Sequence, residues 1–162
     1  MRIKNAKDTD LETLLMLNTF VQQQHTDALP QLFKTSTEPQ QTKDAFKNFV
    51  SDPNSLVLLA EETETAGYLF AQFQHHPANW ARFELKLLYI QHLIVAPKFR
   101  RRGIATKLLS AALDAARRRG IERVELDVWS FNSEAKNFYL KNGFKIFNER
   151  MTIATVTDEA QF

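Results

Sequence analysis

Apolar and polar positions recur with two different periods between residues 83 and 116. From Phe83 to Val95 the chain is rich in apolar and β-branched residues, and it closes on Pro97, whose missing N–H ends a ladder. After Gly103, apolar residues recur at helical spacing and form one stripe. They are Ile104, Leu108, Ala112 and Ala115, with Ala105, Leu109 and Ala116 beside them. The pattern predicts a long strand, a turn and an amphipathic helix.

The N-terminal third reads as a strand followed by helical segments. Residues 1–5 suit a first strand, and Thr9-Asp10-Leu11-Glu12 is a capping-box pattern that opens a helix. Residues 22–41 are polar and contain Pro30 and Pro39, so we expect a loop or broken helix there. A short helix then ends near residue 51.

Shorter patterns predict the remaining elements. Residues 55–61 and 67–74 suit two strands of an antiparallel hairpin, and alternation over 124–128 suits a half-buried strand. Ser133 is expected to cap a short helix, and residues 144–156 are expected to supply one or two final strands. Together these elements predict an α+β fold, with a mostly antiparallel mixed sheet and helices on both faces.

Composition narrows the class of protein. The chain has 162 residues, 44% hydrophobic and 25% charged, which suits one globular domain over residues 1–162. Lys and Arg number 21 and Asp and Glu 19, so the net charge of +2 does not indicate a general polyanion binder. The absence of cysteine excludes disulfides, a thiolate nucleophile and cysteine-ligated zinc.

Targeting and metal signals are absent from the sequence pattern. The first ten residues lack the apolar core of a signal peptide, and no apolar run approaches the ~20 residues of a membrane span. We therefore expect a cytoplasmic protein with no membrane partner. His75-His76 has no carboxylate or third histidine at ligand spacing nearby, so we expect no metal site.

The turn before the main helix combines dense positive charge with a glycine. It reads Lys98-Phe99-Arg100-Arg101-Arg102-Gly103. The first turn of a helix has N–H groups without acceptors, and the macrodipole adds positive charge there. Gly103 permits close approach, and Thr106 offers a hydroxyl. The turn is therefore a candidate phosphate site, and a solvated basic loop is the alternative.

Two motifs give the chain a family resemblance. Arg100-Arg101-Arg102-Gly103-Ile104-Ala105 matches the pattern [Q/R]-x-x-G-x-[G/A] between a strand and a helix. Some thirty residues later, the segment 132–144, NSEAKNFYLKNGF, matches N-x-x-A-x-x-F-Y-x-x-x-G-F. In this order the two motifs resemble those of GNAT-superfamily N-acetyltransferases. The match covers roughly residues 67–147, and it implies the GNAT acyl-CoA N-acyltransferase fold, with a sheet splayed at its centre between strands ending near Val95 and Val128.

The resemblance implies acetyl-CoA as co-substrate and assigns residues to it. The pantetheine arm would fill the wedge between the splayed strands and bond strand backbone like an added strand. The pyrophosphate would lie on the amides of the basic turn. The residues implied are Leu93, Ile94, Val95, Arg100, Arg101, Arg102, Gly103, Ile104, Ala105, Thr106 and Asn132. For Asn132 the alternative is a turn or capping role.

The resemblance also implies how protons move. An amine with a pKa near ~10.4 must lose a proton before it attacks the thioester, and a backbone N–H, here that of Val95, would stabilise the oxyanion. Tyr139 would protonate the departing thiolate, since a simple thiol has a pKa near ~8.5. Core packing, with the hydroxyl bonded to a carbonyl, is the alternative for Tyr139.

The general base is open in the sequence. Relatives that acetylate polyamines often carry a Glu-Asp pair where this chain has Gln91-His92. His92 can accept a proton, and strand alternation predicts that it and Gln91 lie on opposite faces. A structural His92, Glu84 as base and a water chain remain alternatives.

The acceptor is left open as well. Family members wall the acceptor site with the region after the first helix, which makes His25, Asp27, Phe33 and Lys34 candidates, with a solvated connection as the alternative.

We expect direct acetyl transfer to a primary amine, with a small molecule favoured over a protein terminus or lysine. A non-catalytic acyl-CoA-binding module is the rival hypothesis, since Gln91 cannot take a proton. Nucleic-acid binding would rest only on residues 98–102 and is not expected. A homodimer through the apolar segment 151–156 is possible.

Overall fold

The computed structural model describes residues 1–34, 38–153 and 155, and within them five strands form one sheet beside four α-helices. In chain order the elements are β1 (Arg2–Asn5), α1 (Leu11–Ala28), α2 (Pro39–Ser51), β2 (Ser55–Glu61), β3 (Thr65–His76), β4 (Leu85–Val95), α3 (Ile104–Arg118), β5 (Arg123–Leu126) and α4 (Ser133–Lys141). The strands lie in the order β1-β2-β3-β4-β5, and only β4 and β5 run parallel. The predicted α+β class and mixed sheet are confirmed.

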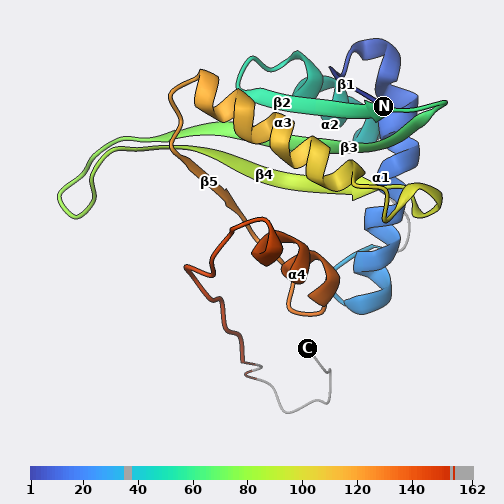
Figure 1. Cartoon of the computed structure of the whole chain (residues 1–162). Helices are drawn as coiled ribbons and strands as arrows, with labels where there is room; N and C mark the ends of the chain where they lie inside the picture. Colours follow the sequence, from blue (N-terminus) through green and yellow to red (C-terminus); the bar gives the residue numbers. More distant parts are fainter. Residues whose placement is uncertain (35–37, 154, 156–162) are drawn as a thin grey trace.

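Helices cover both faces of the sheet (Figure 1). Alternate residues of β3 show which helices lie on which side. The Tyr68 hydroxyl donates to Asn18 of α1, and the ring of Phe70 stacks on Phe49 of α2. Phe73 points the other way, where the guanidinium of Arg119, directly after α3, lies 3.9 Å from its ring centre. We call these two sides the α1–α2 face and the α3 face.

The core is the apolar layer between the sheet and α3, together with the layer under α1 and α2. The helix stripe expected from the sequence is buried: Ile104, Leu108, Leu109, Ala112 and Ala116 are each at most 1% exposed. Burying a large apolar side chain contributes about 1.5–3 kcal/mol. This packing fixes the N-terminus of α3 at the end of β4.

A β-bulge interrupts β4 at Gln91. His92 pairs with Phe70, but the neighbouring Ala71 pairs with Ile90, so Gln91 is an extra residue. The side-chain amide of Gln91 donates to Gln72, while His92 contacts Tyr68, and both partners lie on the α1–α2 face. The expectation that strand alternation separates Gln91 from His92 is therefore wrong, because the bulge breaks the period of two.

The sheet splays beyond Ile90. The parallel ladder between β4 and β5 runs from Leu87 with Arg123 to Ile90 with Leu126, where β5 ends. Within the described residues, the segment 92–95 of β4 is paired with β3 alone. The predicted splay between β4 and β5 is confirmed, although β5 ends at Leu126 instead of near Val128. It lies beside the edge strand of the described sheet and not at its centre, because the described residues after Phe144 add no strand beyond β5.

The N-terminal helices differ from the sequence prediction. α1 continues to Ala28, because Val21 and Thr26 are buried in line with the apolar residues of the first turns. Pro39 is the first residue of α2, where its missing N–H costs nothing. The capping interaction is also different, because the Asp10 carboxylate accepts from the backbone N–H of Lys7 and no side-chain bond from Thr9 caps the helix.

The final strands expected over residues 144–156 are absent from the described part of that segment, residues 144–153 and 155. Its apolar side chains find no second strand there and stay exposed, among them Ile146, Phe147, Met151 and Ile153. Residues 154 and 156 lie outside the described residues. The apolar content of the segment misled the prediction, because a strand also needs a pairing partner.

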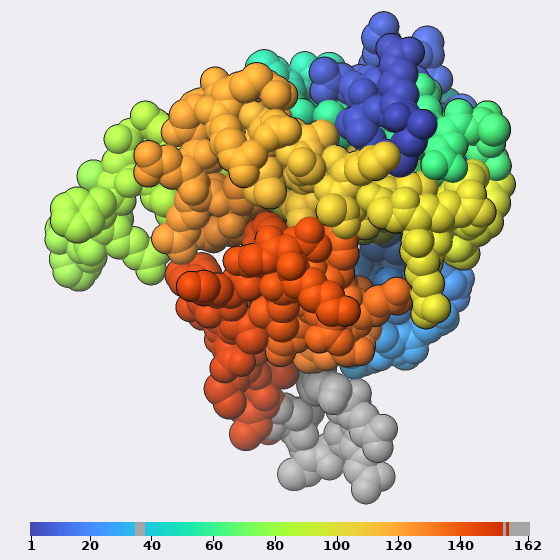
Figure 2. All heavy atoms as spheres, in the orientation of Figure 1, coloured from blue at the N-terminus to red at the C-terminus, as the bar shows by residue number. Residues whose placement is uncertain are grey.

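The hairpin between β3 and β4 projects from the body of the molecule (Figures 1 and 2). Trp80 and Phe83 near its tip are 98% and 96% exposed. No helix in the described ranges is long and apolar enough to cross a membrane.

The strand pair β3–β4 predicts a sensitive position at Gly67. A Cβ added there would lie 2.3 Å from the carbonyl oxygen of Ile94 and 3.1 Å from Cα of Val95, so the strands would have to shift. We expect Gly67→Ala to lower the free energy of unfolding by about 3 kcal/mol, measured by urea denaturation. Gly120→Ala is the control, because an added Cβ there would contact no other atom within 4 Å. Only the positive φ is unfavourable for alanine, and we expect it to lower the free energy of unfolding by about 1 kcal/mol. Equal losses for both variants would contradict this account.

Candidate active site

Among the described residues, the side of β4 that faces away from β3 has no strand partner beyond Ile90. The N–H of Ala96 donates to Ala66 and so points toward β3. Because successive N–H groups of a strand alternate in direction, those of Leu93 and Val95 point the other way, where β5 has ended. The Val95 carbonyl points there too, and the Arg100 side chain donates to it at 3.3 Å. An extended peptide-like ligand could complete the ladder here.

The loop after β4 turns sharply into α3. Arg101 and Gly103 both have positive φ, 61° and 75°, and Gly103 is the N-cap of α3 without a side-chain cap. The N–H groups of Ile104, Ala105 and Thr106 begin the helix, and the first in-helix bond comes from Lys107 to Gly103. A Cβ on Gly103 would meet no protein atom within 4 Å. The loop thus presents free amides to open space, as an anion site requires.

Some basic residues of this loop form ion pairs with described residues, and others do not. Lys98 pairs with Glu64 at 2.6 Å and Arg102 with Glu62 at 3.7 Å, both acids being in the β2–β3 turn. Their cations also lie over the ring of Phe99. Arg101 forms no ion pair with any described residue. Sequence analysis did not foresee this division, since nothing in the pattern brings residues 62–64 beside residues 98–102.

His92 lies in a hydrogen-bonded chain on the α1–α2 face. Its Nδ1 is 2.9 Å from the Tyr68 hydroxyl, which also lies 3.2 Å from the side-chain oxygen of Asn18. Burial, with a smaller contribution from His25, lowers the pKa of His92 to about 4. The imidazole is therefore neutral at pH 7. When Tyr68 donates to Asn18, its oxygen accepts from Nδ1–H, and Nε2 keeps a free lone pair.

Tyr139 lies on α4 with its ring among aromatic neighbours. The ring centres of Phe138 and Phe144 are 5.2 and 5.4 Å from it. Burial raises the pKa of Tyr139 to about 12, so the hydroxyl keeps its proton at pH 7. No described residue is hydrogen-bonded to that hydroxyl, so the backbone-bonded alternative considered for Tyr139 is not what the structure has.

Asn132 is the N-cap of α4. Its side-chain oxygen accepts from the backbone N–H of Ala135 at 3.0 Å, so the capping role expected of Ser133 belongs to Asn132. The side-chain amide of Asn132 has no bond to a described residue. Capping fixes the direction of that amide.

An aromatic cluster joins α1 to the loop before α4. His25 stacks on Phe33 at 4.6 Å between ring centres, and Trp129 contacts both edge-on. Phe131 stacks against Trp129. We call these four residues the aromatic bridge. Two of the four acceptor-wall candidates therefore lie in it, and the aromatic pair after β5, which sequence reasoning missed, supplies the other half.

Asp27 and Lys34 lie outside the aromatic bridge. Asp27 accepts from the side chain of Gln23, and the Lys34 carbonyl accepts from Gln22. The first bond lies within α1, and the second ties α1 to the segment that follows it.

Glu84 lies at the projecting hairpin, where it pairs with His75 at 2.7 Å and Lys86 at 3.4 Å. It precedes His92 by eight positions along the chain, roughly 26 Å at 3.3 Å per position of a strand. The structure does not bring Glu84 into the site. In the described part of the chain, no group of His, Asp or Glu could hold a metal ion.

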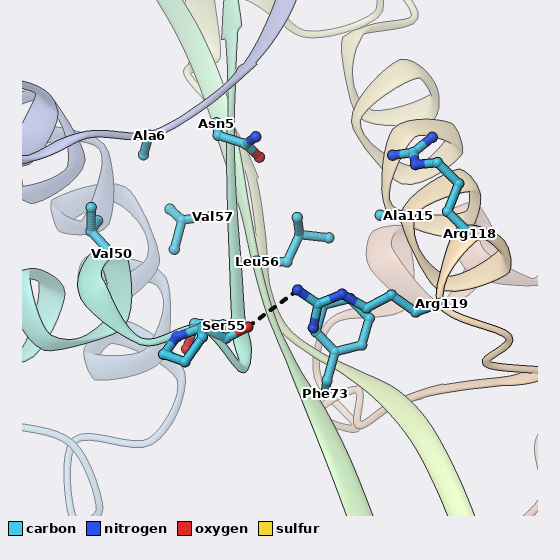
Figure 3. A pocket seen from close by; sticks show the side chains of 11 residues that line it. Asn5, Ala6, Val50, Ser55, Leu56, Val57, Phe73, Ala115, Arg118 and Arg119 are labelled. Carbon is cyan, nitrogen blue, oxygen red and sulfur yellow. Dashed lines mark hydrogen bonds between the residues drawn. The ribbon is translucent and has the colours of Figure 1, made fainter.

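A surface hollow of about 470 Å³ lies at the other end of α3 (Figure 3). Asn5, Leu56, Phe73 and Arg119 are among its lining, and Arg119 donates to the carbonyl of Pro53. The 15 residues of α3 place it roughly 22 Å from the basic loop, at 1.5 Å per residue. This hollow is not part of the candidate site.

Burial of His92 predicts how stability depends on pH. The unfolded chain binds a proton at this histidine near pH 6.5 and the folded protein only near pH 4, so the unfolded state gains the proton first as the pH falls. We expect this to remove about 3 kcal/mol of stability between pH 6.5 and 4. Denaturation curves of the wild type and His92→Gln across that range measure it. The variant should lack this part of the loss, and parallel curves would contradict the account.

Comparison with known proteins agrees with this geometry. The model of the acetyltransferase (GNAT) family matches residues 13–144. The aminoalkylphosphonate N-acetyltransferase of Salmonella typhimurium is 35% identical over 127 residues, which cover 76% of this chain and 79% of that protein.

Solved structures share the fold over nearly the whole chain. A mutant of the BH1408 protein of Bacillus halodurans superposes with a TM-score of 0.91 at 26% identity, covering 96% of this chain and all of the other. The aminoglycoside N-acetyltransferase AAC(6')-Iy, solved with CoA, superposes with a TM-score of 0.74 at 16% identity. The superposition covers 94% of this chain and 93% of the other, and at this identity it shows the fold alone. With the splayed sheet and the loop before α3, these matches mean that the chain belongs to the GNAT family and is an acetyl-CoA-dependent N-acetyltransferase.

Proposed function

We propose that this protein acetylates a primary amine of a small molecule, with His92 and Tyr139 moving the protons. The observation that carries the proposal is the unpaired side of β4 at Leu93 and Val95, which runs directly into the amide-lined loop at Gly103. The two features match an extended arm that ends in a pyrophosphate.

The cofactor would lie along these groups. The pantetheine arm would lie along residues 93–95 and bond the backbone of Leu93 and Val95, which faces away from β3, and the free side-chain amide of Asn132 would donate to it. The pyrophosphate accepts from the amides of residues 101–106, with Arg100 and Arg101 adding charge. Lys98 and Arg102, already paired with acids, hold the loop in place.

The acceptor amine must lose its proton before it attacks. The neutral His92 accepts it at Nε2 while Tyr68 holds Nδ1, directly or through one water. Nitrogen attack on the thioester carbon builds an oxyanion, which the Val95 N–H on the unpaired side of β4 would stabilise. No acyl-enzyme forms, since the chain has no cysteine to carry one.

Collapse of the tetrahedral intermediate releases the CoA thiolate. Tyr139, which keeps its proton at pH 7, donates it to the sulfur. The aromatic neighbours at 5.2 and 5.4 Å hold the ring in one orientation. The nitrogen of the product still carries a second extra proton after the attack, and it passes this proton to the Tyr139 phenolate, directly or through water. His92 releases the first proton to solvent, so both side chains return to their starting protonation states.

A small-molecule acceptor is favoured by two observations. The relative with 35% identity is named for aminoalkylphosphonates, which are small molecules. In addition, the aromatic bridge ties the end of α1 to the loop before α4, which suits a compact acceptor better than an extended peptide. A protein N-terminus or lysine is the alternative acceptor.

The proposed role of Tyr139 predicts a loss of turnover without a loss of binding. We expect Tyr139→Phe to lower kcat at least about 100-fold, because general acid catalysis contributes about 10²–10⁴-fold. CoA release with a panel of small amines, an aminoalkylphosphonate among them, measures kcat, and calorimetry measures acetyl-CoA binding. Unchanged turnover in Tyr139→Phe would contradict the role.

Gly103→Glu is the matched control for the cofactor. It places a negative side chain at a positive-φ position that faces open space, so acetyl-CoA binding should be lost while the protein stays folded. If the wild type binds acetyl-CoA but turns over no small amine or peptide, the protein is a non-catalytic acyl-CoA-binding module instead.

We also propose that the protein is a cytoplasmic homodimer. Phe147, Met151 and Ile153 are exposed apolar side chains that a second copy would cover. Light scattering should therefore give twice the chain mass of 18.8 kDa, and Met151→Glu with Ile153→Glu should return it to one. A monomeric wild type would contradict the proposal.

A further inference from the structure

We propose that Asp127 binds the ammonium group of the acceptor and selects cationic amines, and that Tyr89 positions its carboxylate. This inference rests on the proposed function, because it concerns the amine that reaches the splay. Neither residue belongs to the two motifs that gave the family resemblance.

Asp127 lies at the point where β4 and the edge strand β5 part. The last pair of the β4–β5 ladder is Ile90 with Leu126, and Asp127 is the next residue. The Tyr89 hydroxyl donates to its carboxylate at 2.6 Å. The bond is made across the two strands just before they diverge, so it fixes the carboxylate at the mouth of the splay.

Asp127 shares a face of the sheet with His92. Tyr89 pairs with Gln72, which alternates with Phe70 along β3 and so lies on the α1–α2 face. The bulge at Gln91 keeps His92 on that face as well, where it contacts Tyr68. An amine held by Asp127 therefore approaches from the side on which the proposed base lies.

The carboxylate of Asp127 is available to a ligand. It forms no ion pair with a described residue, whereas Glu125, the other acid on this face of β5, is bound to Arg123. Burial and the bond to Asp127 raise the pKa of Tyr89 to about 12, and Arg150 opposes this only weakly. Tyr89 therefore stays a donor at neutral pH and occupies one carboxylate oxygen, which leaves the other for an ammonium.

Asp127 supplies a negative charge that no residue of β4 provides. Gln91 and His92 carry no negative charge there at pH 7, so an acceptor ammonium would find no ion partner on β4 itself. Asp127 offers one from the neighbouring strand. A single free carboxylate favours an acceptor with one ammonium near the reacting nitrogen, or the reacting ammonium itself before it loses its proton.

Steady-state kinetics with butylamine and 1,4-diaminobutane test the assignment. We expect Asp127→Asn, which keeps an acceptor for Tyr89 but loses the charge, to raise KM for the amine at least tenfold. KM for acetyl-CoA should stay within twofold. Tyr89→Phe should raise the amine KM less, because the charge remains. Glu125→Gln is the matched control and should leave the amine KM unchanged, since that acid is already paired.

The possible failures are distinguishable. If the wild type acetylates neither these amines nor the wider amine panel, the proposed function fails, and this inference with it. If the wild type is active and Asp127→Asn leaves the amine KM unchanged, only the inference is overturned. A fall in kcat with an unchanged amine KM also overturns it, because Asp127 would then act on a proton and not on substrate binding.

Discussion

The proposed active site depends on one edge of β4 whose backbone groups have no strand partner among the described residues. Beyond Ile90, β4 keeps its partner β3 and loses β5, so the backbone groups of Leu93 and Val95 face a wedge. Such groups are costly when buried without a partner, which makes the wedge a binding site for a chain-like ligand. The rest of the fold keeps this side of β4 unpaired. β3 pairs with the opposite edge of β4, the core under α3 packs against the sheet, and the short β5 ends before it can pair with residues 92–95.

Two further features follow from the same strand. The bulge at Gln91 turns both Gln91 and His92 to the α1–α2 face, so the proposed base and Asp127 share one side of the sheet. The strand then ends in the loop of Arg101 and Gly103, whose amides begin α3. Cofactor arm, phosphate and acceptor are thus positioned by consecutive parts of one segment, and the acids of the β2–β3 turn hold its basic loop.

Most of this segment could be predicted from the sequence, because its signals are local. The β-branched run, the glycine at a helix start and the stripe beginning at Ile104 each depend on neighbours in the chain. What could not be predicted depends on contacts across the sheet. The bulge needs the register with β3, the pairing of Lys98 with Glu64 needs a distant turn, and the Tyr89–Asp127 bond needs the alignment of β5.

The sequence predictions for the C-terminal segment and for the end of α1 were wrong for related reasons. Apolar content alone predicted strands over 144–156, although the described residues there have no pairing partner. Polar content and two prolines predicted a loop or broken helix over residues 22–41, although Thr26 is buried and α1 continues to Ala28 before the break.

The most direct test of the central claim is amide hydrogen exchange of β4 with and without acetyl-CoA, read residue by residue by NMR. The account predicts slower exchange at Leu93 and Val95, whose N–H groups face the wedge, and little change at Ile94, which already bonds β3. Protection confined to residues 101–106, with Leu93 and Val95 unchanged, would contradict it, because the loop would then bind a phosphate while the wedge stayed empty.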